Sequence, residues 1–141
     1  DYLLTRKQFG TTLSTFQALQ HRMADMLIET ELSRSMLYQA LAALAGPEVD
    51  CDRGLSAAKA AISQSAIFTC RQSIQLHGGI GMTEELMVGH FYKRVWSLAS
   101  LLGNVDHHLD VFIAQTPIPP IPADIADKGK PEKTGSPAMT S

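Results

Sequence analysis

Two short segments of the chain carry residue types that can bind phosphate groups. Arg6 and Gln8 lie close together near the start, and the run from Gln75 to Gly81 reads QLHGGIG. A guanidinium group offers paired N–H donors that match phosphate oxygens, and glycines let backbone N–H groups approach such a ligand closely. Each segment alone has a plainer explanation, because Arg6 could be a solvated charge and the glycines a helix stop. Residue type alone therefore permits a phosphate site without establishing one.

Other candidates for chemistry are weaker. His107 and His108 are adjacent, and neighbours on a helix point about 100° apart, so exposed helix residues are favoured over a metal pair. Cys51 and Cys70 are the only cysteines, and no Cys/His set has the spacing of zinc ligands. We expect no metal and no disulfide framework, which fits a reducing, cytoplasmic setting.

The elements that must position these residues are helices. Apolar residues recur three or four apart from about residue 12 to 44, and Gly46-Pro47 supplies a stop. A short acidic loop, residues 48–52, should follow, with Asp52 as the N-cap of a second helix over about 52–77. Further helices are predicted over about 84–102 and 105–115, with Gly103-Asn104 as the break between them and Asn104 as the N-cap of the last helix. With no alternating strand pattern, the fold class is all-α, an antiparallel four-helix bundle.

The bulk composition bounds the function. The 141 residues are 45% hydrophobic and 18% charged, which suits one globular domain, here residues 1–115. The net charge of −2 disfavours nucleic acid as a partner, and no stretch is apolar enough for a membrane span. Residues 116–141 are rich in proline and predict a disordered tail. The chain opens on Asp1 without methionine, which indicates a piece of something longer.

Three ordered motifs together resemble a known family. They are RKQFG at residues 6–10 with Phe16-Gln17, QLHGGIGMTEE at residues 75–85, and Lys93-Arg94 followed by Gly103-Asn104. In this order and spacing they are similar to the C-terminal helical domain of the acyl-CoA dehydrogenases, and the resemblance covers about residues 2 to 115. Single motifs would be weak evidence, whereas three on matching helices are strong.

The resemblance implies an FAD-dependent enzyme that introduces an α,β double bond into an acyl-CoA thioester. In the family this bundle packs on an N-terminal helical domain and a middle β-domain and forms subunit contacts, so this chain alone is expected to be inactive. Partners would be the acyl-CoA substrate, an electron-transferring flavoprotein or similar acceptor, and a second subunit, identical or related. The cofactor-binding residues it implies are Arg6, Gln8, Phe9, Gln17, Gln75, Leu76, His77, Gly78, Gly79, Gly103 and Asn104.

One position departs from the family pattern. Many members carry a glutamate, the base that removes the α-proton, immediately before the closing Gly-Thr, and here that position is Leu102. Leucine cannot accept a proton, so the catalytic residue is unassigned. In order of preference, an earlier helix upstream of Asp1 supplies the glutamate, a partner subunit supplies it, or dehydrogenase activity is lost. The last two make a non-catalytic partner subunit or assembly domain the alternative function.

Overall fold

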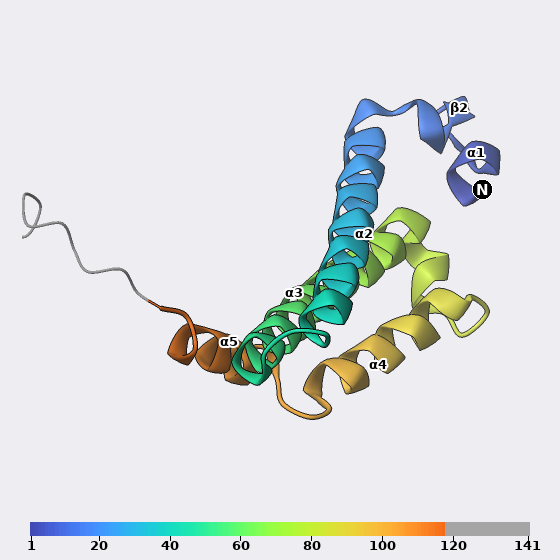
Figure 1. Cartoon of the computed structure of the whole chain (residues 1–141). Helices are drawn as coiled ribbons and strands as arrows, with labels where there is room; N and C mark the ends of the chain where they lie inside the picture. Colours follow the sequence, from blue (N-terminus) through green and yellow to red (C-terminus); the bar gives the residue numbers. More distant parts are fainter. Residues whose placement is uncertain (118–141) are drawn as a thin grey trace, which may run out of the picture.

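A computed structural model describes residues 1–117 of the chain and shows an almost entirely helical molecule (Figure 1). Four long helices follow one another in these residues: α2 (Gln17–Ala43), α3 (Glu48–His77), α4 (Met87–Ser100) and α5 (Val105–Ala114). The prediction of an all-α, four-helix architecture is confirmed. The tail predicted over 116–141 lies, from residue 118 on, outside the described residues.

The start of α3 corrects the predicted boundary. Residues 48–52, expected as an acidic loop, form the first turns of the helix, and Pro47 rather than Asp52 is the N-cap residue. The Cys51 amide donates to the Pro47 carbonyl at 3.0 Å. Proline is compatible with a helix start, and Glu48 and Asp50 in the first turn interact favourably with the positive end of the helix dipole.

The first residues form small elements that periodicity did not predict. A short helix α1 (Tyr2–Thr5) leads into a hairpin of β1 (Lys7–Gln8) and β2 (Thr11–Thr12), followed by a 3-10 turn η1 (Leu13–Thr15). Gln8 pairs with Thr11, and the loop residues Phe9 and Gly10 have φ of 52° and 82°. Two positive φ angles suit the tight turn of a two-residue hairpin. Strands of two residues are too short to show alternation, which is why the pattern missed them.

Helix α3 is the centre of the fold, since α2, α4 and α5 all pack against it. Its contacts with α2 run antiparallel: Arg22 donates to Gln72 at 2.7 Å near one end, and Gly54 meets Ala43 at the other. A Cβ atom on Gly54 would lie 2.6 Å from that of Ala43. Small side chains thus let these helices approach closely.

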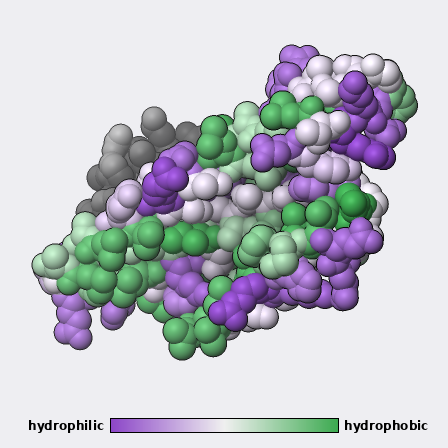
Figure 2. Space-filling model, turned by 90° about the vertical axis from the view of Figure 1, so that its right-hand side faces the viewer, coloured by the Kyte–Doolittle hydropathy of each residue, from purple (hydrophilic) through white to green (hydrophobic). Residues whose placement is uncertain are grey.

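The core of this chain is small for its size. The buried apolar residues are Leu3, Ala40, Ala58, Ala60, Leu76 and Ala99. Helix α2 and its C-cap residue Leu44 also expose large apolar side chains, which in α2 include Leu27, Leu37, Tyr38 and Leu41. Figure 2 shows apolar side chains gathered into a band on one face of the molecule. An exposed apolar surface of this kind marks an interaction face. No helix within residues 1–117 has the length and hydropathy to cross a membrane.

Candidate flavin-binding groove and the α4–α5 loop

A groove of about 530 Å³ lies between the first residues of the chain and the C-terminal end of α3. Its walls come from α1, the hairpin and the start of α2 on one side, and from the end of α3 and the 3-10 turn η2 (Gly78–Met82) on the other. The predicted cofactor residues that line it are Arg6, Gln8, Gln75, Leu76, His77, Gly78 and Gly79. The fold therefore brings together two motifs separated by nearly 70 positions of sequence.

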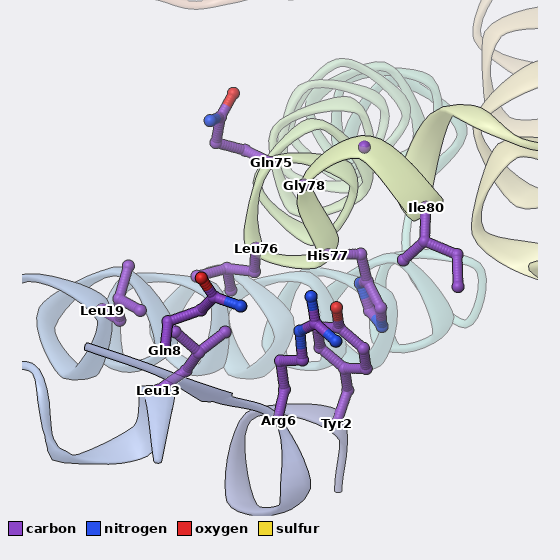
Figure 3. A pocket seen from close by; sticks show the side chains of 11 residues that line it. Tyr2, Arg6, Gln8, Leu13, Leu19, Gln75, Leu76, His77, Gly78 and Ile80 are labelled. Carbon is purple, nitrogen blue, oxygen red and sulfur yellow. The ribbon is translucent and has the colours of Figure 1, made fainter. Parts of the chain in front are cut away.

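The polar side chains of this groove have few partners in the chain. Arg6, Gln8 and Gln75 are exposed, and none forms a hydrogen bond or ion pair through its side chain with another residue within the described range. In Figure 3 the Arg6 guanidinium lies beside Tyr2 and His77, whereas the Gln75 amide points away from it. Donors left free at a groove are available to a ligand that carries phosphate oxygens.

The backbone at the end of α3 is also open to a ligand. Gly78 ends the helix with φ of 62°, which a residue with a side chain rarely adopts, and nothing lies within 4 Å of a Cβ atom at Gly78 or Gly79. A ligand can therefore lie against this backbone without displacing protein atoms, while the Gly78 N–H itself donates to the Gln75 carbonyl oxygen. The residues present fit a phosphate-bearing cofactor.

His77 is held by contacts within this wall. Its Nδ1 lies 2.7 Å from the Ser73 carbonyl oxygen, so Nδ1 carries the proton that is donated, and its ring packs on Tyr2 with 4.7 Å between ring centres. Tyr2 was not predicted to be a site residue, although it stands four positions before Arg6. That spacing would have placed both residues on one face of a helix.

Phe9 and Gln17 lie outside the groove lining. Phe9 occupies the hairpin turn, is 92% exposed and meets Phe16 edge to face at 6.2 Å between ring centres. Gln17 is the exposed first residue of α2. Apart from this contact with Phe16, the large apolar side chain of Phe9 is almost fully exposed at positive φ, so we expect it to contact another molecule or domain.

Gly103 and Asn104 lie in the loop between α4 and α5, far from the groove (Figure 1). The Asn104 side chain accepts the His107 amide at 2.9 Å, which confirms it as the N-cap of α5. Gly103 has φ of 107°, and a Cβ atom there would lie 2.5 Å from the His107 ring. Leu102 also has positive φ, 61°, and is 86% exposed. For leucine this conformation costs about 1–2 kcal/mol.

His108 corrects the expectation that both adjacent histidines are exposed helix residues. His107 is exposed, but His108 is half-buried and hydrogen-bonds on both sides of its ring. Its Nδ1 lies 3.3 Å from Ser56 Oγ, and its Nε2 lies 3.1 Å from the Leu102 carbonyl oxygen. The adjacency of the two histidines could not predict these hydrogen bonds, because the partners of His108 are a carbonyl oxygen in the α4–α5 loop and a serine on α3.

The described residues hold no group of three side chains arranged for a metal ion. Cys51 and Cys70 are both free thiols, and burial raises the pKa of the Cys70 thiol above its usual value. A thiol with a raised pKa is a weaker nucleophile at neutral pH.

These features define a helical domain whose edge groove is suited to a phosphate-bearing ligand, and comparison with known proteins identifies the family. The family model described as "Acyl-CoA dehydrogenase, C-terminal domain" matches residues 1–115. The chain belongs to the acyl-CoA dehydrogenase family and corresponds to its C-terminal domain.

Relatives and solved structures agree with this assignment. The chain is 38% identical over 92 residues to the probable acyl-CoA dehydrogenase FadE25 of Mycobacterium tuberculosis, covering 65% of this chain and 24% of the relative. It is 33% identical over 102 residues to the acyl-CoA dehydrogenase IpdE2 of the same species, covering 72% and 30%. Butyryl-CoA dehydrogenase from Megasphaera elsdenii superposes with a TM-score of 0.72 at 28% identity, covering 80% of this chain and 29% of that one.

A further solved structure, the Tcur3481-Tcur3483 steroid ACAD, superposes with a TM-score of 0.75 at 30% identity, covering 81% of this chain and 31% of that one. The chain thus spans less than a third of the length of the relatives it matches.

Proposed function

We propose that this chain is the flavin-contacting and subunit-interface domain of an enzyme that oxidises an acyl-CoA thioester to its α,β-unsaturated form with FAD. The observation that carries the proposal is the groove, where Arg6 and Gln8 from the start of the chain meet Gln75 to Gly79 from the end of α3. Membership of the family supports the reaction class. Bound FAD would supply the hydride acceptor.

Each groove residue has a role in cofactor binding under this proposal. The Arg6 guanidinium binds phosphate oxygens, the Gln8 and Gln75 amides hydrogen-bond polar atoms of the cofactor, and Gly78 and Gly79 leave room for the cofactor to lie against the backbone. Leu76, which is 8% exposed, and His77, half-buried against Tyr2, form the floor. Phe9 and Gln17 contact the cofactor or the subunit from beside the groove.

The two candidate cofactor contacts serve two flavin sites of an oligomer. The groove lies at the C-terminal end of α3, whereas the Gly103-Asn104 loop contacts α3 near Ser56. Gln75 lies nineteen positions after Ser56 on the same helix, which is about 28 Å along the axis. We infer that the groove reaches the flavin of a neighbouring subunit and the loop lies toward a second flavin. The exposed apolar residues of α2 would then be covered by an identical or related subunit.

The base that removes the α-proton must be a residue other than those that line the groove or form the α4–α5 loop. Leu102 occupies the position of the glutamate found in many members, and it carries no ionisable group. We favour a glutamate on a preceding helix, then one from an unlike partner subunit. A solved relative named for two components, Tcur3481-Tcur3483, supports keeping the second option.

The alternative function is a non-catalytic partner subunit or assembly domain, which Leu102 specifically favours. In either case we propose acyl-CoA as the substrate of the complete assembly and an electron-transferring flavoprotein or similar carrier as the electron acceptor. A cytoplasmic setting is consistent with the two free thiols. Most of the pocket that selects the acyl group is built by residues outside this chain.

The test uses the full-length protein that contains this domain. We expect it to purify with flavin absorbance and to reduce an artificial electron acceptor when acyl-CoA is added. If wild type is active, replacing upstream glutamates one at a time should locate the base, and full activity through all replacements would assign it to a partner subunit. If wild type binds flavin but is inactive and Leu102→Glu creates turnover, the non-catalytic alternative is supported. Absence of bound flavin under all conditions would reject both.

A further inference from the structure

We propose that Ser56, Lys59 and His108 are positioning residues that hold the α4–α5 loop, so that Leu102 forms an apolar wall of the acyl-binding site. This inference rests on the proposed function, because it assigns Leu102 to substrate specificity rather than to proton transfer. Its evidence is a set of hydrogen bonds that converge on one short loop from α3 and α5.

Lys59 holds the end of α4. Its Nζ donates to the Leu98 carbonyl oxygen at 2.5 Å. Leu98 lies in the last turn of α4, and its carbonyl oxygen also accepts the Leu101 amide at 3.2 Å. A carbonyl oxygen can accept two hydrogen bonds, so Lys59 adds a charged donor that interacts favourably with the negative end of the helix dipole. The place where α4 ends, and hence where the loop begins, is therefore fixed from α3.

His108 holds the loop itself. A carbonyl oxygen can only accept, so His108 Nε2 carries the proton donated to the Leu102 carbonyl at 3.1 Å. In the neutral ring Nδ1 is then an acceptor, and Ser56 Oγ, 3.3 Å away, donates to it. Ser56 is only 6% exposed, so its hydroxyl has little access to water. The serine thereby selects the ring tautomer that can bind the loop.

The conformation held in this way is strained and presents an apolar side chain. Leu102 combines positive φ with 86% exposure, and Gly103 leaves no space for a side chain beside His107. Strain of this kind persists where surrounding contacts over-determine the backbone, and it clusters at functional sites. A groove of about 340 Å³ adjoins the loop and is lined by Leu55, Lys59, Leu98, Leu101, Leu102 and His108. Four leucines, contributed by α3, α4 and the loop, line this groove and suit contact with a hydrocarbon chain.

The first test measures how well the loop backbone is protected from hydrogen exchange and does not depend on enzyme activity. Hydrogen exchange measured by mass spectrometry on the full-length protein should show residues 98–107 exchanging about five- to tenfold faster in His108→Ala and in Lys59→Met, the change expected from losing one hydrogen bond. His108→Gln keeps a donor at the end of its side chain and should retain most of the protection. His90→Ala and Lys93→Met, on the exposed part of α4, are the matched controls. Unchanged exchange in His108→Ala and Lys59→Met would overturn the proposal.

The second test asks whether these residues act through Leu102. Leu102→Ala and His108→Ala should each change the ratio of kcat/KM between a short and a long acyl-CoA by about tenfold or less, as expected for small changes in an apolar pocket. In the double variant the two changes should not add, because a displaced loop already removes the contact. Additive changes, or a lowered melting temperature with an unchanged ratio, would assign His108 a purely structural role.

The two tests separate this inference from the proposed function. If wild type shows no acyl-CoA turnover but the loop loosens as described, the proposed function fails while the positioning role stands. If wild type turns over and neither the loop nor the chain-length ratio responds, the inference fails while the proposed function stands.

Discussion

The two ends of α3 hold their polar groups in opposite ways. At the C-terminal end, Arg6, Gln8 and Gln75 line a groove, and their side chains have no hydrogen-bond or ion-pair partner in the described part of the chain. At the other end, Asn104 and His108 are engaged in hydrogen bonds within the chain, and the side chain left exposed is Leu102. The groove is therefore suited to gain hydrogen bonds from a polar ligand. The loop has already used its polar groups and offers apolar surface.

The largest effect should follow from filling the space at Gly103. Gly103→Ala forces a Cβ atom to within 2.5 Å of the His107 ring at a φ of 107°, so we expect a loss of about 2–4 kcal/mol of stability from strain and displaced packing. Denaturant unfolding of the full-length protein measures this. Gly79→Ala is the matched control, because open space surrounds that position. Equal stability of the two variants would contradict the conclusion that the loop at Gly103 is tightly packed while the groove at Gly79 is open.

Removing the positive charge of Arg6 from the groove should weaken FAD binding without lowering the stability of the fold. Arg6→Ala should weaken FAD retention by about 1.5–3 kcal/mol, or one to two decades in Kd, because a charge-assisted phosphate contact is lost. Titration of the full-length apoprotein with FAD measures the change. Arg34→Ala, which removes an exposed guanidinium 3.1 Å from Glu31, should leave FAD affinity unchanged. Unaltered affinity in Arg6→Ala would show that this groove is not the phosphate site.

Asn104 distinguishes a helix cap from a cofactor contact. Asn104→Ala should cost about 1 kcal/mol of stability because the His107 amide loses its acceptor. Asn104→Ser restores a capping oxygen and should recover most of it. Thermal unfolding compares the three proteins with flavin removed. Should FAD affinity fall in both variants while stability holds, Asn104 would be a ligand of the cofactor instead.

The smallest expected effect is an increase in stability instead of a loss. Leu102→Gly removes the penalty of positive φ, about 1–2 kcal/mol, and adds about 0.5–1 kcal/mol of unfolded-state entropy, so the protein should gain between about 0 and 1.5 kcal/mol of stability. Little burial is lost, since Leu102 is 86% exposed. Urea unfolding at matched protein concentration checks the sign. A destabilised variant would mean that Leu102 packs against another domain or subunit in the complete protein.

Much of the architecture was predictable from local pattern. The periodicity of apolar residues predicted helices that correspond to α2 to α5, and Asn104 was expected to be an N-cap, as it is. Boundaries were less accurate: Glu48 to Asp52 begin α3 rather than forming a loop. The hairpin at Phe9 was missed because its strands have two residues each.

The sequence by itself determined the helical class, through the spacing of its apolar residues, and the family, through three motifs kept in order. It also showed that no base stands at Leu102. Only the tertiary structure decided which motifs share a site: Arg6 and Gln75 line one groove, while Gly103 lies at the far end of α3. It alone paired His108 with Ser56, 52 positions away. The physical reason is that helix periodicity depends on near neighbours in sequence, whereas hydrogen bonds between helices depend on how whole elements pack.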